Sequence, residues 1–125
     1  IVTFVKKRMD TIYFLASCDT CRKIIKSLPK NNLKFHDIRQ DSISVEELER
    51  MKTLAGSYEA LFSKRAKLYT ERGLKNQTLS EEDYKTLILE HYTFLSRPVF
   101  IISDQIFIGN SQQNMLKVMK TLGNV

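Results

Sequence analysis

The sequence predicts an α/β domain with a mixed four-stranded sheet, in which a β-α-β unit, a helical insertion and a β-β-α unit follow one another. Residues 11–16 are apolar on both faces, as in a central strand that is covered on each side. Residues 24–28 then repeat apolar side chains at helical spacing. Near the C-terminus two short apolar runs, residues 99–102 and 106–108, flank a polar turn, which is typical of an antiparallel hairpin.

We expect residues 1–125 to form a single domain, because hydrophobic residues at 42% and charged residues at 27% are ordinary globular proportions. A chain of this length can bury a core without disulfide bonds. Residues 1–9 form no recognisable element, since three successive basic residues interrupt their apolar start. We therefore expect the functional chain to begin near Met9, after an extension that is loosely held.

The net charge of +6 comes from 20 Lys and Arg against 14 Asp and Glu, and the basic residues are spread over several segments. A solvated basic surface accounts for most of them. Such a surface also accepts anionic partners, which leaves open an acidic protein, an oxyanion substrate or weak nucleic-acid contact. We expect no direct sequence-specific nucleic-acid binding. We also expect no membrane span, because the apolar runs are far too short.

The first helix should begin at the C-x-x-C segment directly after the first strand and end near Leu28, before Pro29. Asp19 or Ser17 can cap it. At the helix mouth, the helix dipole and unpaired N–H groups favour the thiolate of Cys18, and the guanidinium of Arg22 can add to this effect. Cys21 falls on the apolar face of the helix, so the two thiols are expected to differ.

Both cysteines belong to this one C-x-x-C, and the chain has no signal-peptide pattern, so we expect a cytoplasmic protein. In a reducing compartment such a pair is typically catalytic, redox-sensing or metal-binding, and inert thiols are the alternative. A zinc site would need further ligands. His36 and His91 lie far apart and lack ligand spacing, so no metal is expected.

Residues 33–38 alternate apolar and polar side chains, which predicts a half-buried second strand, parallel to the first, with His36 on its solvated side. A helical insertion of about residues 44–95 follows. Its first helix starts at a capping box opened by Ser44 and stops at Gly56, and a later helix starts at Ser80. After the hairpin, a last helix capped by Ser111 carries an apolar stripe.

This order of elements, with C-x-x-C at the first helix and Pro98 before the third strand, resembles the thioredoxin fold. In that fold the proline is usually cis and faces the redox cysteines, so Pro98 would take this positioning role. The resemblance narrows to the ArsC family, which joins glutaredoxin-dependent arsenate reductases and Spx-type regulators. It rests on three further segments, which are Ser63-Lys64-Arg65-Ala66-Lys67, Leu95-Ser96-Arg97-Pro98-Val99 and Ile106-Phe107-Ile108-Gly109.

The resemblance implies that Cys18 is the nucleophile and that Arg65 and Arg97 bind an oxyanion or stabilise the thiolate. Guanidinium groups and helix-terminal N–H groups suit both roles. Two positions depart from the reductase pattern. Gly109-Asn110 stands where reductases carry a further arginine, and Phe14 stands where they carry a histidine. Cys21 is not part of the usual reductase loop but does occur in Spx-type proteins.

Two functions follow from this resemblance. The first is a thiol-dependent oxidoreductase like arsenate reductase, in which Cys18 attacks and Cys21 resolves the adduct as an intramolecular disulfide. It would bind no cofactor and would draw electrons from glutathione and glutaredoxin or from thioredoxin, acting on a thiol partner protein or a small oxyanion. The second is an Spx-like redox-sensing transcriptional regulator that binds the RNA polymerase α-subunit.

Overall fold

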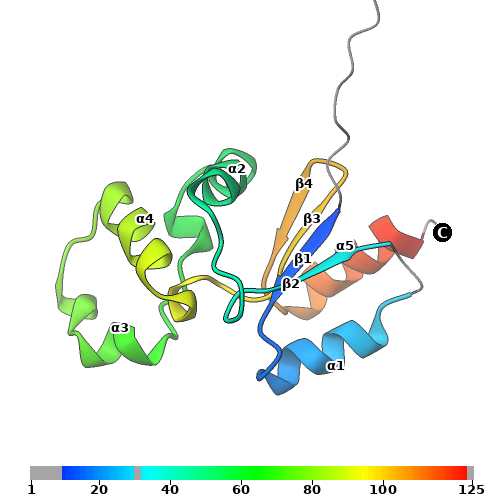
Figure 1. Ribbon diagram of the computed structural model, residues 1–125, viewed down its shortest axis with the longest axis horizontal. Coiled ribbons are helices and arrows are strands. Elements are labelled where there is room, and N and C mark those ends of the chain that lie inside the picture. Colours follow the sequence, from blue (N-terminus) through cyan, green and yellow to red (C-terminus); the bar gives the residue numbers. More distant parts are fainter. Residues whose placement is uncertain (1–9, 30–31, 124–125) are drawn as a thin grey trace, which may run out of the picture.

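A mixed four-stranded sheet forms the centre of the computed structural model, which describes residues 10–29 and 32–123 (Figure 1). The strand order is β2-β1-β3-β4. β1 pairs with β2 in parallel and with β3 antiparallel, and β3 pairs with β4 antiparallel. The strands are β1 (Thr11–Phe14), β2 (Lys34–Asp37), β3 (Val99–Ile102) and β4 (Gln105–Ile108). The predicted fold class is therefore confirmed, whereas the expected loose extension 1–9 lies outside the described residues.

The first strand and helix differ in detail from the prediction. β1 ends at Phe14, two residues earlier than expected, and helix α1 (Asp19–Ser27) follows a short turn. The residue at the N-cap is Cys18 rather than Ser17 or Asp19. Its side chain makes no capping hydrogen bond, which leaves the first-turn N–H groups to interact with a thiolate at this position.

Between β2 and β3 the described chain is helical, as predicted. It forms α2 (Val45–Ala55), η1 (Glu59–Leu61), α3 (Lys67–Glu71), η2 (Leu74–Asn76), α4 (Glu81–Glu90) and η3 (Tyr92–Phe94), where η denotes a 3₁₀ helix. The predicted capping box is present at α2, where Ser44 pairs with Glu47. The predicted helix start at Ser80 also carries one, in which Ser80 pairs with Asp83. Gly56 ends α2 at φ 98°, a left-handed conformation that favours glycine.

The C-terminal hairpin and helix also agree with the prediction. Ser103 and Asp104 form a tight turn at φ 49° and 63°, so that Val99 lies opposite Ile108. Helix α5 (Gln112–Gly123) follows, and the Ser111 hydroxyl accepts a hydrogen bond from the N–H of Asn114 at 3.1 Å. Within the part of the chain that the structure describes, no helix combines the length and apolar character needed to cross a bilayer.

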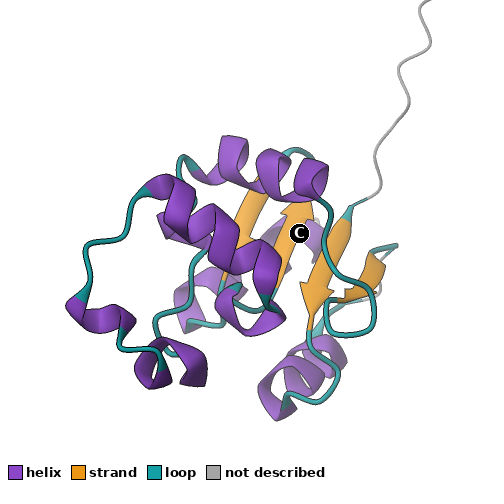
Figure 2. Cartoon of the chain, turned by 60° about the vertical axis from the view of Figure 1, so that its left-hand side comes forward, coloured by secondary structure: helices purple, strands orange, loops and turns teal. Residues whose placement is uncertain are grey.

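Each face of the sheet packs against its own set of helices (Figures 1 and 2). One face meets the inserted helices, and its buried side chains include Tyr13, Val99, Ile101, Leu48, Met51 and Phe94. The opposite face meets α1 and α5, with a second cluster that includes Ile12, Phe100, Ile102, Phe107 and Val118. Because the strands alternate between these faces, β1 and β3 are buried on both sides.

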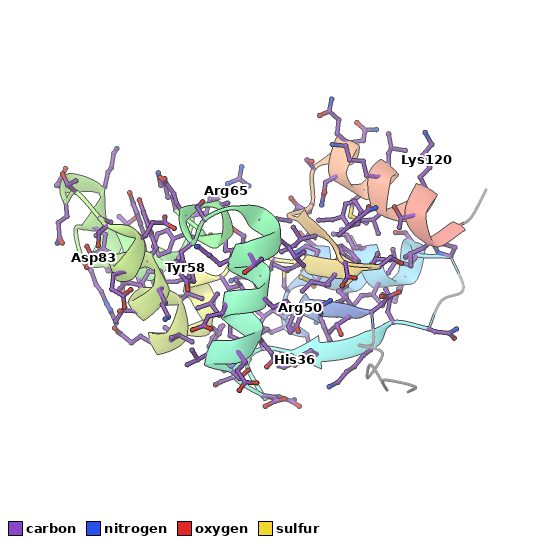
Figure 3. The ribbon with its side chains drawn as sticks, turned by 90° about the horizontal axis from the view of Figure 1, so that it is seen from above. His36, Arg50, Tyr58, Arg65, Asp83 and Lys120 are labelled. Carbon is purple, nitrogen blue, oxygen red and sulfur yellow. The ribbon has the colours of Figure 1, made fainter. Side chains whose placement is uncertain are left out.

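His36 is the clearest error of the sequence prediction, because its side chain is buried and not solvated. It lies on β2 beneath α2 (Figure 3), where its Nε2 lies 2.6 Å from the carbonyl oxygen of Asp41 and its ring packs against Tyr13. Phe35, its apolar neighbour, is 48% exposed instead. The side chains of β2 do alternate between the two faces of the sheet, but the face that carries His36 is the covered one, because helix α2 packs over it at the sheet edge.

Candidate active site

A cavity of about 530 Å³ opens at the N-terminus of α1 and collects most of the residues that the sequence singled out. Four segments that are distant in the sequence meet there: the start of α1, the loop between η1 and α3, the segment before β3, and the exit from β4. Its lining residues are Cys18, Thr20, Cys21, Phe62, Ser63, Lys64, Arg65, Ser96, Arg97, Ile108, Gly109, Asn110 and Ser111. Besides the two cysteines, its ionisable side chains are all cationic.

Cys18 is half-buried at the mouth of α1 and is a free thiol. Burial raises the pKa of this thiol, but interactions with the N–H and thiol of Cys21, the N–H of Thr20 and the charge of Arg97 outweigh it. The pKa of Cys18 therefore lies below its ordinary value. Such a sulfur is a thiolate over a wider pH range, which is the form that attacks.

Cys21 lies one turn further along α1 and is only 1% exposed. Burial raises the pKa of Cys21; the backbone N–H of Leu15 opposes this effect, while the neighbouring charge on Cys18 adds to it. The net pKa of Cys21 is raised, so this residue stays protonated and can donate its S–H to the Cys18 sulfur. The prediction that the two thiols differ is thus matched by their environments.

Arg97 lies half-buried near the thiols. Its charge contributes to the lowered pKa of Cys18 and only partly offsets the effects that raise the pKa of Cys21. Its Nη1 donates a hydrogen bond to the carbonyl of Thr93 at 3.3 Å. The peptide bond that joins Arg97 to Pro98 is cis, as the resemblance to the thioredoxin fold implied. The carbonyl of Pro98 accepts the N–H of Gly109 at 2.8 Å, and this bond joins the segment before β3 to the exit from β4.

Lys64 and Arg65, from the loop between η1 and α3, add two further cationic side chains to the lining of the cavity. Arg65 is exposed (Figure 3). Lys64 is partly neutralised, because its Nζ lies 3.4 Å from the Glu59 carboxylate, a hydrogen bond that raises the pKa of Lys64. Arg65 and Arg97 therefore supply most of the positive charge that remains for an anion at this cavity.

Arg22 does not line this cavity, although the sequence placed it with the other site residues. Its guanidinium pairs with the carboxylate of Asp19 and donates to the carbonyl of Ala16 at 3.2 Å. A carboxylate partner offsets its charge, so less of its field reaches Cys18. Its role in stabilising the thiolate stays a prediction.

Several lining residues were not proposed as site residues from the sequence, above all Ser63 and Ser96. Ser63 and Ser96 meet because the short bridge between Phe62 and Leu95 is held by two backbone hydrogen bonds of 2.8 Å, from Ser63 N–H to the Phe94 carbonyl and from Ser96 N–H to the Leu61 carbonyl. Such long-range pairing leaves no local pattern in a sequence. The only available signal was that both serines fall inside the segments that carry the family resemblance.

No cluster suited to a metal ion occurs among residues 10–29 and 32–123, where no three His, Cys, Asp or Glu side chains converge. The reactive groups that the cavity itself presents are an ionisable thiol, a second thiol within its reach, and guanidinium groups that bind anions.

The chain matches the ArsC family over residues 13–118. It is 29% identical to the global transcriptional regulator Spx 2 of Bacillus cereus, over 89% of this chain and 87% of that protein. It is also 30% identical to an uncharacterised protein of Haemophilus influenzae, over 84% of this chain and 94% of the other.

Solved structures agree in fold. An arsenate reductase from Vibrio cholerae superposes with a TM-score of 0.70 at 23% identity, covering 91% of this chain and 98% of the other. A Bacteroides fragilis protein described as ArsC family related superposes with a TM-score of 0.76 at 23% identity, covering 89% of this chain and 99% of the other. With the match over residues 13–118 and the thiol cavity at the start of α1, this chain belongs to the ArsC family.

Proposed function

We propose that this protein is a cytoplasmic thiol–disulfide oxidoreductase in which Cys18 attacks the substrate and Cys21 resolves the adduct. The observation that carries the proposal is the inequality of the two thiols across one turn of α1. The pKa of the half-buried Cys18 is lowered and that of the buried Cys21 is raised. An attacking thiolate at the surface and a protonated partner behind it are the two groups that disulfide exchange requires.

The steps balance as a two-electron transfer. The Cys18 thiolate attacks one sulfur of a disulfide substrate, a mixed disulfide forms, and the other substrate sulfur leaves as a thiolate that takes a proton from solvent. Cys21 then loses its proton to solvent and attacks the Cys18 sulfur. This second attack forms the Cys18–Cys21 disulfide and releases the remaining substrate thiol. The substrate gains the two electrons that the cysteine pair loses.

The positive charge of the cavity favours a substrate that carries negative charge, either an anion or an acidic thiol compound. Arg65 and Arg97 line the cavity, and no carboxylate is among its lining residues. Asn110 occupies the place where, by resemblance, arsenate reductases carry a further arginine, so one ligand for a free oxyanion is replaced by a neutral amide. We therefore favour a disulfide or thiol adduct over arsenate as the substrate. Glutathione with glutaredoxin, or thioredoxin, would reduce the cysteine pair again, and no bound cofactor is needed.

Turnover of the purified protein tests this proposal. Oxidation of glutathione in the presence of glutaredoxin, or of reduced thioredoxin, would be followed with a glutathione mixed disulfide as substrate and, separately, with arsenate. We expect substrate-dependent turnover in the wild type and none in Cys18→Ser. Cys21→Ser should accumulate the Cys18 mixed disulfide. Wild-type turnover no faster than that of Cys18→Ser, with every electron donor, would contradict the proposal.

A redox-sensing regulator is the second candidate, favoured by the 29% identity to the Bacillus cereus regulator over most of both chains. Under this proposal the Cys18–Cys21 disulfide changes a docking surface, and turnover is incidental. A pull-down with the C-terminal domain of the RNA polymerase α-subunit, in reduced and oxidised states, separates the two functions. Redox-dependent binding without turnover would favour the regulator, whereas turnover without binding would favour the enzyme.

A further inference from the structure

His91 stands at the junction between α4 and η3, at the start of a segment that runs from one cavity of the molecule to another. Its N–H donates to the carbonyl of Leu87 at 3.1 Å and ends α4, while its side chain caps η3. The residue lines a second cavity of about 250 Å³, and the chain six residues later reaches the thiol cavity at Arg97. The short segment from His91 to Arg97 thus connects the two.

The imidazole of His91 holds Thr93. Its Nδ1 accepts the backbone N–H of Thr93 at 3.2 Å and lies 2.9 Å from the Thr93 hydroxyl. A ring nitrogen that accepts a backbone N–H carries a lone pair and no proton. This hydrogen bond therefore fits the neutral imidazole tautomer that is protonated at Nε2. The ring itself is fixed by stacking on Tyr92, with centroids 4.5 Å apart, and by an edge contact with Phe94.

Thr93 in turn holds Arg97. The carbonyl of Thr93 accepts Nη1 of Arg97 at 3.3 Å. The charge of Arg97 is one of the effects that lower the pKa of Cys18. The long arginine side chain has many rotamers. A fixed acceptor at Thr93 restricts them and so increases the fraction of time that the Arg97 charge lies near the Cys18 sulfur.

We propose that His91 is a positioning residue for the redox centre: by holding Thr93, it sets the carbonyl that orients the Arg97 guanidinium toward Cys18. This inference rests on the proposed function, in which Cys18 is the attacking thiol. His91 touches no reacting atom, and its influence passes through Arg97 alone. Loss of the Nδ1 acceptor would free the first turn of η3, because the Thr93 N–H would lose its capping partner.

Two substitutions at this position form a matched pair. In His91→Asn, the amide oxygen stands as many bonds from the backbone as Nδ1 does, so it can accept the Thr93 N–H, and asparagine is a favoured cap. In His91→Gln, the oxygen stands one bond further out and cannot cap in the same way. Ser80→Ala serves as a control, because it weakens the opposite end of α4 without touching the segment from His91 to Arg97.

The readout is the rate at which iodoacetamide alkylates Cys18 as a function of pH, with the modified cysteine identified by mass spectrometry. Near neutral pH we expect His91→Gln to slow alkylation roughly two- to fivefold, the range for loss of one partly solvated charge interaction. His91→Asn and Ser80→Ala should react like the wild type. In an Arg97→Ala background, His91→Gln should have no further effect, because the pathway through Arg97 is already gone.

The inference is overturned if folded His91→Gln reacts like the wild type, or if it slows the reaction equally in the Arg97→Ala background. Should His91→Gln fail to fold, nuclear magnetic resonance on the ¹⁵N-labelled wild type replaces it. Ionising Cys18 should then shift the Thr93 amide and His91 imidazole signals, and unshifted signals would refute the link. Failure of the proposed function is a different result, in which wild-type Cys18 reacts no faster than an ordinary exposed cysteine.

Discussion

Arg97 donates a hydrogen bond to the Thr93 carbonyl at 3.3 Å while its charge acts on Cys18. The guanidinium is therefore held by its own chain before any substrate arrives. Pre-positioned charge favours the thiolate without waiting for a ligand to order it. This relationship predicts that Arg97 is the cationic residue that controls the reactivity of Cys18.

Replacing Arg97 by Ala should raise the pKa of Cys18, because a cationic neighbour that favours the thiolate is removed. Thiolate absorbance, titrated against pH, measures this directly. Arg22→Ala is the matched control, and its effect should be smaller because Asp19 already pairs with that guanidinium. Equal shifts in the two variants would mean that both arginines act on the sulfur, and a shift in Arg22→Ala alone would transfer the role to Arg22.

Asn110→Arg should increase the affinity of the thiol cavity for oxyanions. Asn110 is exposed and lines the cavity, and an arginine there would add a third guanidinium to Arg65 and Arg97. We expect arsenate-dependent turnover, coupled to glutathione and glutaredoxin, to rise roughly tenfold or more, as one charged hydrogen bond is worth about 1.5–3 kcal/mol. Gln113→Arg, on the exposed start of α5, should leave it unchanged. An equal gain in both variants would assign the effect to overall charge.

Ser80→Ala should lower the free energy of unfolding by about 1 kcal/mol, because it removes the hydroxyl that accepts the Asp83 N–H at 3.1 Å. Urea denaturation measures the difference. Thr78→Ala, at an exposed position just before the helix, provides the comparison and should change stability little. If both variants lose the same stability, the capping box contributes nothing specific.

Glu47 should make stability depend on pH in the acid range. Burial raises the pKa of this carboxyl, but the Ser44 N–H, the Tyr13 hydroxyl and His36 outweigh it, and the net pKa is lowered. A carboxyl with a lower pKa in the folded state stabilises the fold above its unfolded pKa of about 4.3, and this contribution is lost as the pH falls through the folded value.

The unfolding free energy of the wild type should therefore fall more steeply from about pH 6 to about pH 3 than that of Glu47→Gln. Glu46→Gln, on the exposed side of the same helical turn, should follow the wild-type curve. Parallel curves for all three proteins would show that the contacts of Glu47 with Tyr13 and Ser44 do not discriminate between its charged and neutral forms.

Local chemistry explains why much of the fold could be predicted from sequence. Ser44 with Glu47, Ser80 with Asp83, and the left-handed Gly56 mark helix ends through hydrogen bonds that span only a few residues. The hairpin follows from two apolar runs around Ser103 and Asp104. Such signals need no knowledge of distant partners, so they were read correctly.

What failed or was missed depends on long-range packing. His36 is buried because α2 covers its side of β2 and brings Glu47 within 3.5 Å of its Nδ1. Ser63 and Ser96 reach the thiol cavity through the Phe62–Leu95 bridge. These partners lie on other elements, which periodicity along the chain does not reveal. The contact of His91 with Thr93 is local by contrast, and it was missed because histidine is not among the residues that usually cap a helix.

The central claim is that Cys18 and Cys21 form one redox centre, and intact-protein mass spectrometry under mild oxidation tests it most directly. The reduced protein would be treated with glutathione disulfide, quenched with acid, and its thiols mapped after alkylation. The account predicts an early glutathione adduct on Cys18, which a Cys18–Cys21 disulfide then replaces, and persistence of that adduct in Cys21→Ser. Two free thiols after prolonged treatment, or an adduct that forms first on Cys21, would contradict it.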